Sequence, residues 1–241
     1  MNILTIGNSF SEDATRYLSQ IARAQGVRFD VVNICIDSCP LERHYRNMLG
    51  GMKDYKLQIN GQHTGFFVTL EEALLSREWH VITLQQVSSL SVKKESYYPY
   101  ITELTEYIRT LQPKAKILLQ ETWAYEDGSQ RLTKELGYTS RKEMLADIQK
   151  AYGETAKAEQ LDGVIPSGTL FDKMLDHGIE KVHRDTFHSS LGLGRYALGL
   201  LWFRMLTGKS VAENTFRDLD IPASDEEIAI AKTCADSFSP L

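Results

Sequence analysis

The chain has 241 residues, of which 42% are hydrophobic, so it is long and apolar enough for one α/β domain with a sizeable core. Its formal net charge is -5 and its lysines and arginines are scattered, which argues against nucleic acid or an anionic membrane as a partner. No apolar run approaches the roughly 20 residues of a membrane-spanning helix, so we expect a soluble protein, either cytoplasmic or secreted with its signal peptide removed.

The chain begins with a strand pattern followed by a helix pattern. Residues 2–6 form a short, uninterrupted apolar run, which is typical of a strand buried on both faces of a parallel sheet. Apolar residues recur at helical spacing over residues 10–25, and Gly26 stands where a left-handed helix end is expected. The sequence therefore predicts a strand, a tight turn at Gly7 and one helix.

This alternation continues along the chain. Four more strands are predicted over residues 29–36, 81–84, 116–119 and 163–165. Helices are predicted over residues 99–111, 141–156, 191–206 and 222–236. The pattern predicts a single domain of residues 1–241 with three α/β/α layers around a five-stranded parallel, flavodoxin-like sheet.

One segment, residues 53–68, interrupts the alternation. It contains Asn60-Gly61 between residues of alternating polarity, and this pair suits the positive backbone angles of a two-residue hairpin turn. We expect an inserted β-hairpin, followed by a short helix with a capping box made by Thr69 and Glu72.

The first candidate for chemistry is Ser9, in the turn after the first strand. Ligands of open parallel sheets bind beyond the carboxyl ends of the strands, which is where this turn is expected. At a helix start, free backbone N–H groups and the helix dipole stabilise a developing anion, so Ser9 is a candidate nucleophile. The alternative is that Ser9 is only a helix N-cap, a common role for serine.

A second polar cluster stands near the other end of the chain, before the apolar helix of residues 191–206. Asp185 and His188 are three residues apart, so one loop can place the carboxylate against one imidazole nitrogen and leave the other for a hydroxyl. The alternative is a capping aspartate beside a surface histidine.

Together the two clusters resemble the SGNH (GDSL-like) hydrolase superfamily. The resemblance rests on three segments: Ile6-Gly7-Asn8-Ser9, Asp185-Thr186-Phe187-His188 and Leu191-Gly192-Leu193-Gly194-Arg195-Tyr196. It implies a serine hydrolase with Ser9 as nucleophile, His188 as base and Asp185 as the acid that orients the base. Two further segments have counterparts in an uncharacterised bacterial branch of that superfamily: Cys39-Pro40-Leu41-Glu42-Arg43-His44 and Leu84-Gln85-Gln86-Val87-Ser88-Ser89.

The residues expected around the oxyanion depart from the superfamily pattern. Asn8 stands where the superfamily usually has an aspartate, and Ser38 or Cys39 occupies the region of a glycine that donates its backbone N–H. After the third predicted strand, Gln85 and Gln86 replace the expected asparagine. A glutamine amide can donate to an oxyanion, and we favour Gln86, since only one of two neighbouring side chains points into a site.

Two more residues are candidates for substrate contact. Trp123, with Tyr125, follows the fourth predicted strand and is placed to offer an aromatic platform to a sugar ring; ordinary loop packing is the alternative. His44 is a candidate for the pocket wall, although an isolated histidine is more often a hydrogen-bonded structural residue.

We expect neither a metal nor a cofactor. The remaining histidines show no ligand spacing with carboxylates. The three cysteines, Cys35, Cys39 and Cys234, form no paired zinc-binding motif and cannot all pair with one another, so free thiols are expected.

The favoured function is that of a serine esterase acting by acyl transfer on a small-molecule or glycan ester. The resemblance favours acetyl groups on carbohydrate hydroxyls, because many members of the superfamily deacetylate glycans. The alternative is a carbohydrate-binding protein that keeps the fold without catalysis, which the altered oxyanion residues favour. A phosphate-binding domain ranks last, because the first turn lacks a glycine-rich loop and a following lysine.

Overall fold

The apolar runs near the start and middle of the chain form the centre of a seven-stranded sheet in the computed structural model, which describes residues 1–241. The strands run in the order β4-β3-β2-β1-β5-β6-β7. Their bounds are β1 (Asn2–Gly7), β2 (Asp30–Cys35), β3 (Tyr55–Ile59), β4 (Gln62–Val68), β5 (Val81–Leu84), β6 (Lys116–Gln120) and β7 (Gly163–Ile165).

Five of these strands are the predicted ones, and they are parallel to one another. β1 lies between β2 and β5, and β6 and β7 follow on the β5 side. This order is that of a flavodoxin-like sheet, so the predicted fold class is confirmed. From β1 the chain adds β2 on one side of the sheet and then returns to add β5, β6 and β7 on the other side. The carboxyl end of β1 is therefore at the topological switch point, where such sheets bind ligands.

The predicted hairpin forms β3 and β4 and extends the sheet. β3 pairs antiparallel with β2, and β4 with β3. The turn residues Asn60 and Gly61 have φ angles of 51° and 79°, as the sequence predicts. A Cβ atom at Gly61 would lie 2.0 Å from the carbonyl oxygen of Arg16, so only glycine allows the hairpin tip to reach the first helices.

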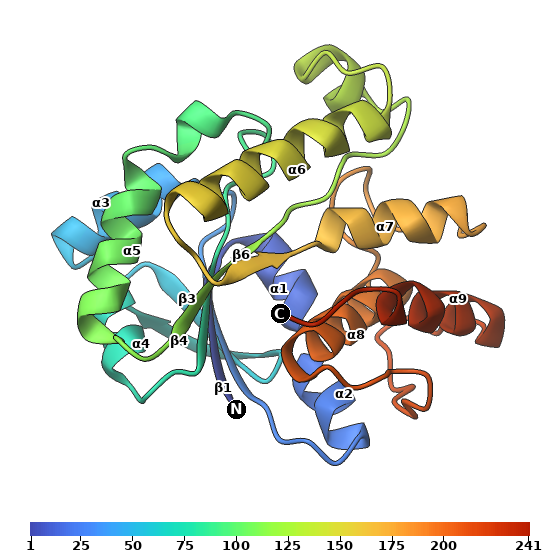
Figure 1. Ribbon diagram of the computed structural model, residues 1–241, viewed down its shortest axis with the longest axis horizontal. Coiled ribbons are helices and arrows are strands. Elements are labelled where there is room, and N and C mark those ends of the chain that lie inside the picture. Colours follow the sequence, from blue (N-terminus) through green and yellow to red (C-terminus); the bar gives the residue numbers. More distant parts are fainter.

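Helices cover both faces of the sheet, with a separate apolar core on each side (Figure 1). One layer comprises α1 (Ser9–Thr15), α2 (Leu18–Ala24), α7 (Ser167–Asp176), α8 (Leu193–Thr207) and α9 (Asp225–Asp236). The other comprises α3 (Leu41–Gly50), α4 (Leu70–Leu75), α5 (Tyr100–Leu111) and α6 (Arg141–Ala158). Two short helical turns, η1 (Lys94–Tyr97) and η2 (Arg131–Glu135), lie between β5 and α5 and between β6 and α6. The predicted capping box of Thr69 and Glu72 is present at α4.

The predicted helices differ from the structure in three ways. The helix expected over residues 10–25 is two helices, α1 and α2, interrupted at Arg16 and Tyr17. Tertiary contacts occupy this break: the Tyr17 hydroxyl donates to the Leu191 carbonyl at 2.8 Å, and Arg16 Nη1 donates to the Gly61 carbonyl at 3.3 Å. Helices α3 and α7 were not predicted, and α9 begins three residues later than expected.

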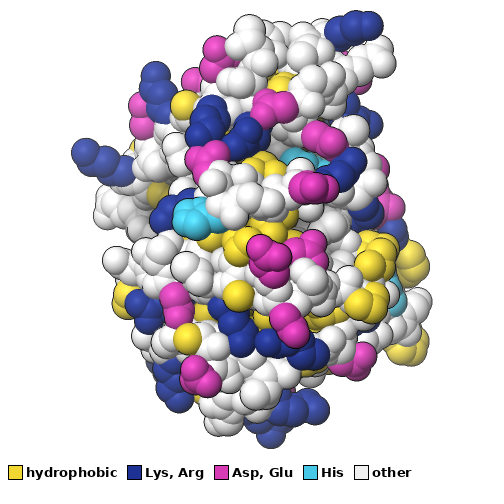
Figure 2. Space-filling view, turned by 90° about the vertical axis from the view of Figure 1, so that its right-hand side faces the viewer, with side chains coloured by type: hydrophobic (Ala, Val, Ile, Leu, Met, Phe, Trp, Pro, Cys, Tyr) yellow, Lys and Arg dark blue, Asp and Glu magenta, His cyan; other side chains and the backbone are white.

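Helix α8 is the most deeply buried helix. Its apolar residues surround the whole helix, because α1, α2, α7 and α9 all pack against it. None of the helices is both long and apolar enough to cross a lipid bilayer. On the face shown in Figure 2, basic and acidic side chains are interspersed and no patch of a single sign dominates.

Candidate active site

Ser9 lies at the carboxyl edge of the sheet, directly after β1. The backbone of Asn8 is extended and α1 begins at Ser9, so the serine is the first residue of a helix. Its Oγ lies 2.9 Å from Nε2 of His188, which is 179 residues away in the sequence. The two clusters singled out in the sequence are therefore neighbours in the fold.

His188 is held by Asp185 through both its ring and its backbone. His188 Nδ1 lies 2.7 Å from Asp185 Oδ2, and the His188 backbone N–H donates to Asp185 Oδ1 at 2.8 Å. Burial favours the neutral carboxyl, but the hydrogen bonds from His188 and from the Phe187 backbone outweigh it and lower the pKa of Asp185 below 3.8. The carboxylate is therefore charged at neutral pH.

The contacts run from hydroxyl to imidazole to carboxylate. A charged Asp185 accepts a hydrogen bond from the protonated Nδ1 of His188, which leaves Nε2 unprotonated and able to accept the hydrogen bond, and then the proton, of Ser9. Ser9 is half-buried and the Asp185 side chain is 45% exposed, so the group lies at the surface of the protein. This arrangement is able to activate a serine hydroxyl as a nucleophile.

Asn8, which the sequence placed among the residues around the oxyanion or substrate, is a structural residue of the Ser9 turn. It is 1% exposed. Its Oδ1 accepts from the Phe10 backbone at 3.0 Å and from Gln85 Nε2 at 2.7 Å, and its Nδ2 donates to the Cys39 carbonyl at 3.2 Å. One amide side chain thus caps α1 and links the ends of β1, β2 and β5. Both Oδ1 and Nδ2 of Asn8 thus have partners within the protein, and the side chain is turned away from solvent.

The turn after β2 contains the residues expected to replace the glycine. Ser38 is exposed and has φ 53°, a left-handed conformation that glycine adopts most readily. The Cys39 backbone N–H donates to the Ile36 carbonyl at 3.2 Å, so it is already used. Of the two residues left open by the sequence, Ser38 is the one whose N–H is not engaged in this turn.

Gln86 does not face Ser9, and the expectation that its amide serves an oxyanion is not met by this geometry. Its Nε2 donates to the carbonyl and the hydroxyl of Ser96, at 3.0 and 3.1 Å. Its Oε1 accepts from the backbone of Leu41 at 3.0 Å and of Val87 at 2.8 Å. The fully buried Gln86 amide therefore ties α3 and η1 to the end of β5, and its neighbour Gln85 is the one that contacts Asn8.

Trp123 is fully buried and is no platform for a sugar ring. Its indole ring stacks on Phe10 with the ring centroids 4.1 Å apart, and its Nε1 donates to the Phe187 carbonyl at 2.7 Å. Tyr125 is also buried and its hydroxyl bonds to Ser88. Trp123 therefore packs against Phe10, the residue after Ser9, and bonds to Phe187, the residue before His188.

His44 lies in the core and exposes no surface to solvent. It is fully buried, its ring stacks on Tyr55, and its Nδ1 lies 3.0 Å from the Tyr55 hydroxyl. Burial lowers the pKa of His44 to about 3, so the ring is neutral. The structural alternative left open by the sequence is the one observed.

The family of the chain follows from comparison with known proteins. Residues 2–237 match the family model described as "Domain of unknown function (DUF4886)". The chain belongs to the DUF4886 family. A crystal structure of a DUF4886 family protein from Bacteroides uniformis is 30% identical, with a TM-score of 0.91 over 98% of this chain and 93% of that one. No functionally curated protein has a significantly similar sequence.

The DUF4886 fold is shared with SGNH hydrolases at low sequence identity. A proposed SGNH hydrolase from Slackia heliotrinireducens is 20% identical, with a TM-score of 0.60 over 83% of this chain and 95% of that one. An acetylxylan esterase from Geobacillus stearothermophilus is 14% identical, with a TM-score of 0.53 over 84% of this chain and 92% of that one. The superfamily resemblance seen in the sequence thus extends to the fold.

Two further residues of this DUF4886 protein are not indicated by its sequence, and one of them contacts the His188 loop. Arg131, from η2, stacks over the Phe187 ring at 4.1 Å, and this ring lies 3.8 Å from the His188 ring, centroid to centroid. Glu121, at the end of β6, is 3% exposed and accepts from the Thr169 backbone at 2.9 Å. Neither belongs to a recognisable motif, because each depends on a contact with a distant element.

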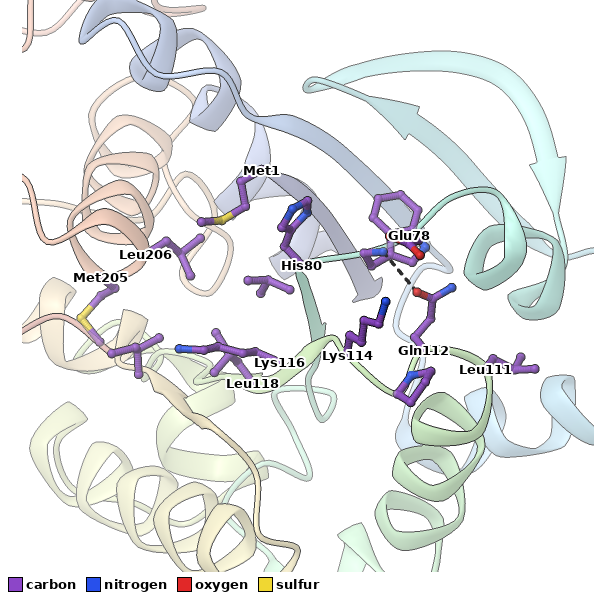
Figure 3. A pocket seen from close by; sticks show the side chains of 14 residues that line it. Met1, Glu78, His80, Leu111, Gln112, Lys114, Lys116, Leu118, Met205 and Leu206 are labelled. Atoms are coloured by element: carbon purple, nitrogen blue, oxygen red, sulfur yellow. Dashed lines mark hydrogen bonds between the residues drawn. The ribbon is translucent and has the colours of Figure 1, made fainter.

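A cavity of about 660 Å³ lies away from Ser9, at the opposite edge of the sheet (Figure 3). It is lined by residues at the amino ends of the parallel strands, such as His80 and Lys116, and by the end of α8. Three further cavities, of about 240 to 460 Å³, are also lined by neither Ser9 nor His188. No group of three or more His, Cys, Asp and Glu side chains is arranged to hold a metal ion.

Proposed function

We propose that the protein is a serine esterase that removes a small acyl group, above all acetyl, from a carbohydrate or similar hydroxyl ester. The observation that carries the proposal is the continuous contact from Ser9 Oγ through His188 to Asp185, at 2.9 and 2.7 Å. Serine, histidine and aspartate in this order and at these distances are the parts that acyl transfer requires.

In the proposed reaction, Ser9 Oγ bonds to the ester carbonyl carbon while His188 Nε2 takes the hydroxyl proton. The tetrahedral intermediate then breaks its bond to the alkoxy oxygen, which receives that proton and leaves as the free alcohol. Water attacks the acyl-serine in the same way, with His188 as base, and the carboxylic acid is released. Asp185 stays charged throughout and stabilises the imidazolium.

Backbone N–H groups are the proposed donors to the oxyanion. The Ser9 N–H stands in the first turn of α1, where N–H groups have no intrahelical acceptor. The turn of Ser38 lies beside it, since Asn8 Nδ2 bonds to the carbonyl of Cys39. We assign the oxyanion to the N–H groups of Ser9 and Ser38, because the Gln86 amide is engaged with Ser96, Leu41 and Val87.

Two observations support a short acyl group on a bulky alcohol. None of the four cavities of about 240 to 660 Å³ is lined by Ser9, His188 or Asp185, which favours an acyl group too short to need such a cavity. The Asp185 side chain is 45% exposed, so the site is accessible to an ester on a large carbohydrate. The similar fold of an acetylxylan esterase supports acetyl as that group.

The nucleophile is tested by incubating the wild type and Ser9→Ala with p-nitrophenyl acetate and with a serine-reactive fluorophosphonate. We expect labelling and turnover in the wild type, and loss of labelling with a fall in kcat on the order of 10⁶-fold in the variant. Ser11→Ala is the matched control, because Ser11 lies on the same helix but its hydroxyl donates to the Asn8 carbonyl. Equal labelling of Ser9→Ala and the wild type would falsify the assignment, and an unreactive wild type would favour a non-catalytic carbohydrate-binding protein.

The acyl group and the alcohol are tested separately. A series of p-nitrophenyl esters from acetate to octanoate is expected to show kcat/KM falling with chain length. Release of acetate from acetylated xylan and acetylated pectin then tests the carbohydrate. A preference for octanoate would contradict the small acyl group, and release of acetate from neither polymer would contradict these glycans as substrates.

A further inference from the structure

His188 is carried by a narrow loop that closes on itself. Val182 and Ser190 stand at its base, where the Ser190 backbone N–H donates to the Val182 carbonyl at 2.7 Å. One step inward, His183 and Ser189 form a single β-bridge, and the Arg184 backbone N–H donates to the His188 carbonyl at 3.0 Å. These backbone bonds give the loop its shape, but they do not determine where it lies relative to Ser9.

A buried carboxylate joins this loop to the helix that begins with Ser9. Asp13 lies one turn further along α1, and its side chain is 0% exposed. Arg184 Nη1 donates to both oxygens of Asp13, at 2.9 and 3.0 Å, and also to the Ser189 carbonyl at 2.5 Å. The Ser189 backbone N–H donates to Asp13 Oδ2 at 3.2 Å. The residue next to His188 is thus bonded to α1 directly and through Arg184.

The same carboxylate is fixed from the other side by helix α8. Arg195 Nε donates to Asp13 Oδ1 at 2.8 Å, and its Nη1 donates to Asp220 at 3.0 Å. Asp220 in turn pairs with Arg16, which follows α1 directly. Two carboxylates and three guanidinium groups therefore form a continuous chain of ion pairs in which each charge contacts at least one charge of opposite sign, as buried charges require.

We propose that Asp13, Arg184 and Arg195 are positioning residues that set the distance between Ser9 Oγ and His188 Nε2. The inference rests on the proposed function, and it goes further by assigning a role to three charged residues that do not touch the reacting atoms. Asp13 is rigidly connected to Ser9 by one helical turn, and Ser189 to His188 by one peptide bond. A shift of either side of this network moves the nucleophile and its base relative to one another.

The test compares Asp13→Asn with the wild type, using p-nitrophenyl acetate well below the unfolding temperature of both. The amide keeps one acceptor oxygen but turns an NH₂ group toward the Arg184, Arg195 or Ser189 donors, so at least one bond is lost. We expect kcat to fall about 10- to 100-fold, the size of effect that a misplacement of about 1 Å produces. KM is expected to stay within about two-fold, because Asp13 contacts no substrate.

Arg184→Gln is the second variant in case Asp13→Asn does not fold, because it leaves the Asp13–Arg195 pair intact. The matched control is Asp172→Asn. Asp172 accepts from Arg141 Nε at 3.1 Å, joins α6 to α7, and makes no hydrogen bond to residues 182–190. We expect the control to lose thermal stability with kcat unchanged. If Asp13→Asn and Arg184→Gln behave like Asp172→Asn, the network is merely structural and the inference is wrong.

A second readout separates this inference from the proposed function. Amide hydrogen exchange of residues 182–190 is expected to accelerate in Asp13→Asn and Arg184→Gln, and to match the wild type in Asp172→Asn. This measurement needs no substrate, so it decides the positioning role even if the wild type hydrolyses no ester. Unchanged exchange in both network variants would overturn the inference, whereas an unreactive wild type with accelerated exchange would overturn only the esterase.

Discussion

Polar residues gather at two places along the carboxyl edge of the sheet, and they are used differently. Where β1 meets the loop of residues 182–190, hydrogen bonds orient Ser9 and His188 toward one another, and Ser9 is half-buried. Where β5 and β6 end, Gln86 and Glu121 are just as polar, but their side chains are buried in bonds to neighbouring elements. The first place has the geometry that the proposed acyl transfer requires, and the second holds helices in position.

The difference shows that a polar residue at a strand end is not by itself a sign of a site. What matters is whether its hydrogen-bonding atoms are already satisfied. Four bonds surround the Gln86 amide, whereas the Ser9 hydroxyl has the His188 ring as its partner, and that partner can take its proton.

The sharpest test of the chemical region is Asp185→Asn. The amide cannot stabilise the imidazolium and favours the wrong tautomer of His188, so we expect kcat to fall about 10⁴-fold. Steady-state hydrolysis of p-nitrophenyl acetate measures the effect. Fluorophosphonate labelling should slow in parallel, and a loss of less than about ten-fold would mean that Asp185 does not orient the base.

Gln86→Ala tests the structural region. Removing this amide leaves the buried backbone N–H groups of Leu41 and Val87 without acceptors and opens a cavity, so we expect a loss of about 4 kcal/mol in the free energy of unfolding. The kcat of the folded variant should stay within about three-fold of the wild type. Urea unfolding and esterase assays at one temperature separate a structural role from a catalytic one. A large fall in kcat at unchanged stability would mean that Gln86 binds the oxyanion.

Glu121 extends the test to pH. Burial raises its pKa to about 7 against the opposing hydrogen bonds from Thr169 and Gly168. Between pH 4.5 and 7 the unfolded chain therefore releases this proton before the folded protein does, and stability falls as pH rises. The contribution of Glu121 is on the order of 3 kcal/mol across this interval.

The measurement is urea unfolding of the wild type and Glu121→Gln at pH 5 and pH 8. The free energy of unfolding of the wild type, relative to that of the variant, should fall as pH rises, because Glu121 ionises and glutamine does not. Glu154→Gln, at an exposed ion pair with Lys94, is the control in which this trend should be absent. Parallel profiles for the wild type and Glu121→Gln would contradict a raised pKa.

The smallest expected effect concerns Ser38, in the turn after β2 that is proposed to bind the oxyanion. Ser38→Gly relieves the left-handed backbone at φ 53° but adds flexibility to the unfolded chain, for a net gain of about 0.5 to 1 kcal/mol in stability. Activity should be retained, because the backbone N–H remains. Thermal unfolding and kcat are measured together, and a marked loss of activity would show that the Ser38 side chain contributes to the site.

Much of the fold was predictable because its signals are local. The five apolar runs have the length and continuity of buried parallel strands, and Asn60-Gly61 specifies a hairpin turn through its own backbone preferences. The helix break at Arg16 and Tyr17 was not predictable, because apolar periodicity continues across it. The contacts at the break come from Gly61 and Leu191, which no local pattern relates to it.

The sequence by itself determined the order of the strands and the residue types of the proposed triad, since strand periodicity, turn chemistry and the spacing of Asp185 and His188 are properties of short segments. Only the tertiary structure decided that Ser9 meets His188, that Gln86, His44 and Trp123 support the fold, and that Asp13 joins the two halves of the site. The physical reason is that a side chain's role depends on which of its polar atoms remain unsatisfied, and partners distant in the chain determine this.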